Sequence, residues 1–117
     1  MRHAEYNLVL QSKQAFSRDI IEHSILYTST APCLLCTATI LLANIPQIVY
    51  SVSHETFGKL ILGIHRYISC EEIISRLGRN TEVVGPILEN EGLQVFQYWG
   101  GIFTSLEDIL RSTGKEL

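Results

Sequence analysis

Two cysteines separated by two residues, Cys33 and Cys36, lie where a strand-like segment gives way to a helix-like one. Residues 24–29 read as a strand, and residues 37–43 form an apolar run without glycine or proline. Residues three apart are neighbours on a helix, so both sulfur atoms point to one side of its first turn. The partial positive charge of a helix N-terminus lowers the pKa of nearby thiols and favours thiolates. The pair therefore predicts half of a zinc site.

A third ligand is available in His3, which begins another segment of helical length. Three protein ligands leave the fourth tetrahedral position open for water, which is the arrangement of a catalytic zinc. Glu5 is two residues away and is not needed as a ligand, so its carboxylate is free to move protons. The sequence thus predicts a catalytic site built on His3, Cys33 and Cys36.

Plainer interpretations of these residues stay open. His3 could cap a helix beside two buried thiols, and Glu5 could be an acid stabilised by the helix dipole. A structural zinc needs a fourth protein ligand, for which Cys70 is the available candidate. Cys70 lies in the sequence Ser-Cys-Glu-Glu, which is typical of a capping box, and we interpret it as a buried thiol.

The order His-Ala-Glu at residues 3–5 and Pro-Cys-Leu-Leu-Cys at residues 32–36 is similar to the zinc deaminase signature. On these residues the chain resembles the cytidine and deoxycytidylate deaminase superfamily, closest to its guanine deaminase and tRNA adenosine deaminase branch. The resemblance implies a Zn²⁺ cofactor held by His3, Cys33 and Cys36, with Glu5 as the catalytic proton carrier. It also implies hydrolytic deamination of an amino-substituted base.

The resemblance covers nearly the whole chain, with departures. Deaminases of this kind place a helix and two strands before the His-x-Glu segment, whereas this sequence begins at that segment. We therefore expect a domain that is partial at its N-terminus and lacks pocket residues. Ala31 stands where the family commonly has glutamate, and Leu34 where it commonly has proline, and neither change touches the zinc chemistry.

We expect one domain over residues 1–117, with an α/β fold of the three-layer α/β/α, cytidine deaminase-like type, N-terminally truncated. Proline at position 46 ends the helix of the cysteine motif. A β-branched run follows it and predicts a strand parallel to the first. The patterns predict helices over 4–16, 33–43, 69–77, 83–91 and from 104, a possible helical turn within 17–23, and strands over 25–29, 47–52 and 93–98.

The net charge of −3 and the sequence pI of about 5.7 provide no general basic face for nucleic acid. A small base or nucleoside is therefore favoured over RNA as the substrate, although nucleic acid stays possible. The odd number of cysteines, three, indicates reduced thiols. The first residues lack the apolar region of a signal peptide, and the run 31–43 is too short to cross a bilayer. We expect a cytoplasmic protein without a membrane segment.

Three residues are candidate substrate contacts. Ala4 and Pro32 adjoin the expected ligands, and His54 follows the second predicted strand. Ligands bind outside the carboxyl ends of strands in open α/β sheets, which places His54 near a pocket by topology. An ordinary loop histidine is the plainer interpretation of His54.

The leading hypothesis for function is a zinc-dependent hydrolase that deaminates a purine or pyrimidine base or nucleoside, with guanine as the first substrate to consider. One alternative is a tRNA adenosine deaminase. Another is a non-catalytic remnant that keeps the zinc and its subunit contacts without a finished pocket. Deaminases of this type usually assemble as dimers, so the resemblance also implies a homodimer.

Overall fold

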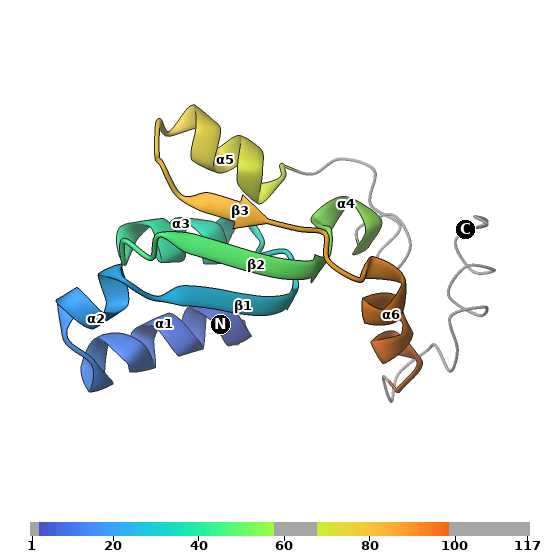
Figure 1. Ribbon diagram of the computed structural model, residues 1–117, viewed down its shortest axis with the longest axis horizontal. Coiled ribbons are helices and arrows are strands. Elements are labelled where there is room, and N and C mark those ends of the chain that lie inside the picture. Colours follow the sequence, from blue (N-terminus) through green and yellow to red (C-terminus); the bar gives the residue numbers. More distant parts are fainter. Residues whose placement is uncertain (1–2, 58–67, 99–117) are drawn as a thin grey trace.

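The computed structural model describes residues 3–57 and 68–98, and it shows helices arranged around a small parallel sheet (Figure 1). The strands lie in the order β1-β2-β3. The elements in chain order are α1 (Ala4–Ala15), α2 (Arg18–Glu22), β1 (Ile25–Thr30), α3 (Leu34–Leu42), β2 (Gln47–Val52), α4 (His54–Phe57), α5 (Cys70–Arg76), β3 (Glu82–Val84), α6 (Glu89–Gln94) and a 3₁₀ turn (Val95–Tyr98).

Both pairs of strands in this sheet are parallel. Leu26 of β1 is opposite Ile48 of β2, which is in turn opposite Val83 of β3. Side chains alternate between the two faces of a strand, so these three apolar residues line one face of the sheet. This arrangement confirms the predicted α/β fold and the parallel pairing of the first two strands.

The main core lies between that face of the sheet and three helices, α1, α3 and α5. Helix α3 contacts α1 on one side and α5 on the other. Burial of apolar side chains supplies most of the favourable free energy of folding, and here it fixes the position of α3 on the sheet. The buried residues of this core are Val9, Ile21, Leu26, Ile40, Leu41, Ala43, Ile45, Ile48, Ile73 and Ile74.

The opposite face of the sheet is approached by α6 near the carboxyl end of β2. Ser51 alternates with the buried Tyr50 and Val52, so its side chain points to this second face. Its hydroxyl donates to the carbonyl of Leu88, just before α6, at 3.3 Å. Farther along this face, Tyr27 of β1 is 70% exposed. Helix α6 therefore approaches the second face at one end of the sheet, which is compatible with a truncated α/β fold of the predicted type.

Two predicted elements are wrong. The pattern predicts a helix over residues 83–91, but Val83 and Val84 belong to β3 and pair with β2, and helix α6 begins only at Glu89. Residues 93–98 were expected to form a strand, but they form the end of α6 and a 3₁₀ turn. Their alternating pattern does not match their burial, because Leu93 is buried while Val95 is 60% exposed. The predicted helix from residue 104 lies outside the described residues.

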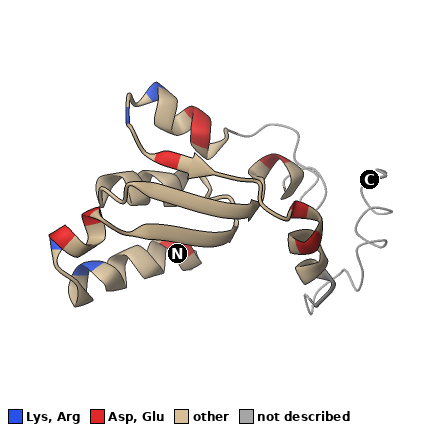
Figure 2. Cartoon of the chain, in the orientation of Figure 1, with Lys and Arg blue, Asp and Glu red and all other residues tan. Residues whose placement is uncertain are grey.

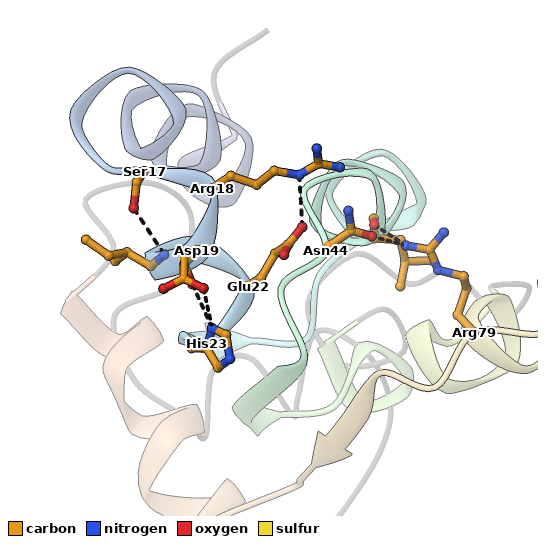
Figure 3. A network of polar contacts seen from close by, with 9 residues as sticks. Ser17, Arg18, Asp19, Glu22, His23, Asn44 and Arg79 are labelled. Carbon is orange, nitrogen blue, oxygen red and sulfur yellow. Dashed lines mark hydrogen bonds and ion pairs between the residues drawn. The ribbon is translucent and has the colours of Figure 1, made fainter.

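Side-chain contacts hold the chain in place at the start of α2 and at the end of α3 (Figure 3). The Ser17 hydroxyl accepts a hydrogen bond from the first turn of α2, which is the usual role of serine before a helix. Arg18 and Glu22 form an ion pair four residues apart on that helix. Beyond α5, the Arg79 guanidinium donates to the Leu41 carbonyl and to Asn44 Oδ1, so it ties this segment to the end of α3.

The start and the end of α5 are as the sequence pattern predicts. Ser69 precedes α5, and its hydroxyl accepts a hydrogen bond from the Glu72 N–H at 3.1 Å, as the capping box predicts. Gly78 follows α5 with a φ of +64°, a left-handed conformation that glycine adopts without steric cost.

Among the helices within residues 3–57 and 68–98, none has the length and apolar character needed to cross a membrane.

Candidate metal centre

Two helix starts come together at the candidate metal centre. His3 is the residue before α1, and Cys33 is the residue before α3, with Cys36 in the first turn of that helix. Helices α1 and α3 contact one another, which brings residues about 30 positions apart to one place. Both cysteines are thus at a helix start, as their position in the sequence predicts.

The loop that carries the cysteines is held at both ends by hydrogen bonds. The Ala31 N–H donates to the Val52 carbonyl at 2.8 Å, so the loop runs beside the end of β2. The buried Thr37 hydroxyl donates to the Pro32 carbonyl at 3.2 Å and closes the loop against α3. These bonds fix the direction from which Cys33 and Cys36 approach His3.

The ligand atoms lie at distances that suit one zinc ion. Nδ1 of His3 is 3.3 Å from Sγ of Cys33 and 3.4 Å from Sγ of Cys36. All three atoms lie within 4.8 Å of one another. Zn–S bonds of about 2.3 Å and Zn–N bonds of about 2.0–2.1 Å in a tetrahedron place nitrogen and sulfur about 3.5 Å apart. One imidazole and two sulfurs are also ligands that zinc prefers, so this group fits Zn²⁺.

The surroundings of Cys36 disfavour its thiolate when no metal is bound. Burial, with the neighbouring Cys33 and the negative charge of Glu5, raises the pKa of the Cys36 thiol to about 12. The expected lowering of the pKa of this thiol at the helix N-terminus is therefore not found in the metal-free protein, where burial raises the pKa. A metal ion that binds here must displace this proton.

Glu5 lies beside the three ligand atoms, on the first turn of α1. Its Oε2 is 3.6 Å from Sγ of Cys36, and its Oε1 accepts a hydrogen bond of 2.6 Å from the Thr28 hydroxyl on β1. One carboxylate oxygen is thus bound to the sheet while the other faces the sulfur atoms. Thr28 is not among the site residues predicted from the sequence. The available signal was that Thr28 shares the core-facing side of β1 with the buried Leu26, where a hydroxyl needs a partner.

Cys70 is not part of this group. Among the described residues, the side chains close enough to share one ion are His3, Cys33 and Cys36. Cys70 is buried at the start of α5 in a small cluster with Ala31 and Tyr50. Burial, followed by the charge of Glu71, raises the pKa of its thiol to about 12. It is a buried thiol that lies outside the group of candidate ligands.

The three candidate substrate contacts have different surroundings. Ala4 is exposed at the start of α1, whereas Pro32 is fully buried in the cysteine loop. His54 is the first residue of α4 and follows β2 by one residue. The cysteine loop runs beside the end of β2. The backbone of His54, two residues beyond that end, therefore lies near the loop. Their contact with a substrate stays a prediction.

Comparison with known proteins identifies similar sequences. A sequence model described as the cytidine and deoxycytidylate deaminase zinc-binding region matches residues 1–52. A Schizosaccharomyces pombe protein named "Probable cytosine deaminase" is 31% identical in a 90-residue alignment that covers 73% of this chain. A Xenopus tropicalis protein named "tRNA-specific adenosine deaminase 2" is 40% identical over 85 residues, again 73% of this chain. The chain spans 56% and 39% of the lengths of these two relatives.

Proposed function

The chain belongs to the cytidine and deoxycytidylate deaminase superfamily, and on that premise we propose that it is a zinc-dependent hydrolase that deaminates a purine or pyrimidine base or nucleoside. The observation that carries this proposal is the convergence of His3, Cys33 and Cys36 within 4.8 Å, with Glu5 beside them. Residues 1–117 would form one deaminase domain.

Each residue of the site has a separate role in this proposal. His3, Cys33 and Cys36 hold Zn²⁺, which when bound lowers the pKa of a water molecule to about 7. Glu5 takes a proton from the attacking water and delivers protons to the ring nitrogen and to the leaving amine. The carbon–nitrogen bond of the exocyclic amine is replaced by a carbon–oxygen bond, so one base and one water give one oxo-base and one ammonia.

Within the described residues, the distribution of basic side chains supports a small substrate. The basic residues of the described part, Lys13, Arg18, Arg76 and Arg79, lie in or next to α1, α2 and α5 (Figure 2). Arg18 and Arg76 are paired with glutamates on their own helices, and Arg79 is bound to the end of α3. RNA binding depends on basic side chains that are free to meet phosphates. Guanine remains our first prediction for the substrate, and cytosine joins it because of the Schizosaccharomyces pombe relative.

Deamination of adenosine in tRNA is the second candidate function. It is supported by the 40% identity to the Xenopus tropicalis relative. If this candidate is right, the protein binds tRNA with an affinity that falls steeply as salt concentration rises. Salt-independent or unmeasurable binding to tRNA, together with turnover of a free base, would decide for the small substrate.

The proposal is tested by ammonia release from a panel that contains guanine, cytosine, their nucleosides and an adenosine-containing tRNA. The zinc-loaded protein should release ammonia from one of these substrates. Glu5→Gln should keep its zinc and lose activity by at least about 10²-fold, because the amide cannot carry the proton. Glu82→Gln, the same change at an exposed position of β3, is the matched control and should stay active.

Two results would contradict this function. Unchanged turnover in Glu5→Gln would remove Glu5 from its role. Zinc-loaded protein that deaminates nothing on the panel would instead favour a non-catalytic member of the family. From the resemblance, we also propose that the protein is a homodimer. Analytical ultracentrifugation tests this separately, and a monomer would contradict the homodimer but not the proposed activity.

A further inference from the structure

Thr28 of β1 forms a hydrogen bond with Glu5, the residue proposed to carry protons. It lies 23 residues from Glu5 in the chain, and its hydroxyl donates a hydrogen bond of 2.6 Å to Glu5 Oε1. This length is typical of a strong hydroxyl–carboxylate bond. Since β1 is part of the sheet and α1 is a separate element, the bond fixes the Glu5 carboxylate relative to a second part of the molecule.

The Thr28 hydroxyl has two possible acceptors. Its oxygen also lies 2.9 Å from the backbone carbonyl of Thr30, the last residue of β1. One hydroxyl proton serves one acceptor at a time, and the charged oxygen of Glu5 is the closer and stronger acceptor. As a threonine in a strand, Thr28 also has a restricted side-chain torsion. The carboxylate of Glu5 is therefore bound to a rigid donor.

Glu5 has three side-chain torsions and no comparable restriction of its own. With Oε1 bound to Thr28, the other oxygen, Oε2, points to the group of ligand atoms, 3.6 Å from Sγ of Cys36. Proton transfer needs the carboxylate within hydrogen-bond distance of the reacting atoms. A displacement of about 1 Å can cost about 10²-fold in rate.

We propose that Thr28 is a positioning residue that holds Glu5 Oε1, so that Oε2 alone faces the metal and the substrate. The inference rests on the proposed function, since it assigns Glu5 the proton transfer. Thr28 is not one of the candidate metal ligands, and in this proposal it acts through Glu5. Its loss should lower the rate of the chemical step and leave metal binding and substrate binding unchanged.

Thr28→Val keeps the shape of the side chain and removes the hydroxyl, and Thr28→Ser restores the hydroxyl. In the zinc-loaded full chain we expect Thr28→Val to lower kcat about 10- to 100-fold with KM changed less than about threefold. Zinc content and melting temperature should stay close to those of the unmodified protein. Thr28→Ser should recover most of kcat. Thr39→Val removes a hydroxyl that bonds the Leu35 carbonyl on α3 instead, and as the matched control it should retain kcat.

A double variant shows whether Thr28 acts through Glu5. Thr28→Val combined with Glu5→Gln should be no slower than Glu5→Gln alone, because the group that Thr28 positions is already disabled. A further loss of the same size as in the single variant would overturn the proposal. Unchanged kcat in Thr28→Val, or loss of zinc from that variant, would also overturn it.

Crystal structures of the zinc-loaded protein and of Thr28→Val provide a readout that does not need turnover. We expect the Glu5 carboxylate to leave its position by about 1 Å or more in the variant, with His3 and Cys36 in place. A carboxylate that stays in place overturns the positioning role, whether or not the protein deaminates a base. Absence of deaminase activity in the unmodified protein would instead contradict the proposed function, and the structures would still decide the role of Thr28.

Discussion

Thr56 and Glu89 lie 33 residues apart in the chain and are joined by a hydrogen bond of 2.9 Å from the threonine hydroxyl to Oε1 of the glutamate. The other carboxylate oxygen accepts the Ser53 N–H at 2.8 Å. Ser53 is the residue between β2 and α4, so Glu89 fastens the start of α6 to the segment that carries His54. The part of the chain that follows β2 is therefore held by a carboxylate from a distant helix.

Glu89→Ala should destabilise the protein, because it leaves the Ser53 N–H and the Thr56 hydroxyl without their acceptor. Hydrogen bonds to charged groups are worth about 1.5–3 kcal/mol, and partial exposure of Glu89 favours the lower end of that range. Urea unfolding measures the change. Glu91→Ala, at an exposed position of the same helix, is the control and should cost less than about 0.5 kcal/mol. Equal stability of the two variants would show that the contacts of Glu89 contribute nothing.

Gly92 of α6 is required by the close approach of this helix to β2. A Cβ at position 92 would collide with the Ser51 hydroxyl and would lie 2.9 Å from Cγ2 of Val52. Gly92→Ala should therefore destabilise the protein by about 1–3 kcal/mol, the usual cost of overfilling a packed site. Thermal unfolding measures it, with Asn90→Ala at an exposed position of the same helix as the control. A melting temperature equal to that of the control would contradict the observed packing.

Stability should fall at alkaline pH. Burial is the first cause that raises the pKa of Cys70 from 9.0 to about 12, and it also raises the pKa of Tyr50, followed by the hydrogen bond of Tyr50 to Glu71. The folded state thus holds these protons more tightly than the unfolded state, so their stabilisation is complete below about pH 9 and is lost as pH rises toward about 12. Urea unfolding from pH 7 to pH 11 should show this loss.

The variant Tyr50→Phe separates the contribution of Tyr50 to this pH dependence from that of Cys70. It removes a titrating hydroxyl and its 2.8 Å bond to Glu71, so we expect a stability about 1 kcal/mol lower at pH 7 but a shallower decrease above pH 10. Tyr27→Phe, at an exposed position of β1, is the control and should leave the pH dependence unchanged. A decrease in Tyr50→Phe as steep as in the unmodified protein would contradict the role of Tyr50.

The parts of this fold that follow from local chemistry could be predicted from the sequence. The cysteine motif, the serine before α5 and the β-branched run of β2 each depend on residues that are close in the chain. Strand β3 could not be predicted, because a strand of three residues is defined by pairing with β2 rather than by its own pattern.

Some features of the candidate site could likewise be predicted from the sequence, and others could not. The grouping of His3, Cys33 and Cys36 could be predicted from residue types and spacing, whereas the contact between Thr28 and Glu5 depends on how α1 lies against β1. The high pKa of Cys36 also depends on tertiary packing, because burial rather than helix position dominates it. Contacts between distant segments leave little trace in a single sequence.

The central claim is that His3, Cys33 and Cys36 bind one zinc ion together, and the metal content of the purified full chain tests it most directly. We predict about one zinc per chain in the unmodified protein and in Cys70→Ala, whose buried thiol lies outside the group. Cys33→Ser, Cys36→Ser and His3→Ala should each lose most of it. Unmodified protein that holds no zinc and takes none up, or Cys36→Ser that keeps a full equivalent, would contradict the account.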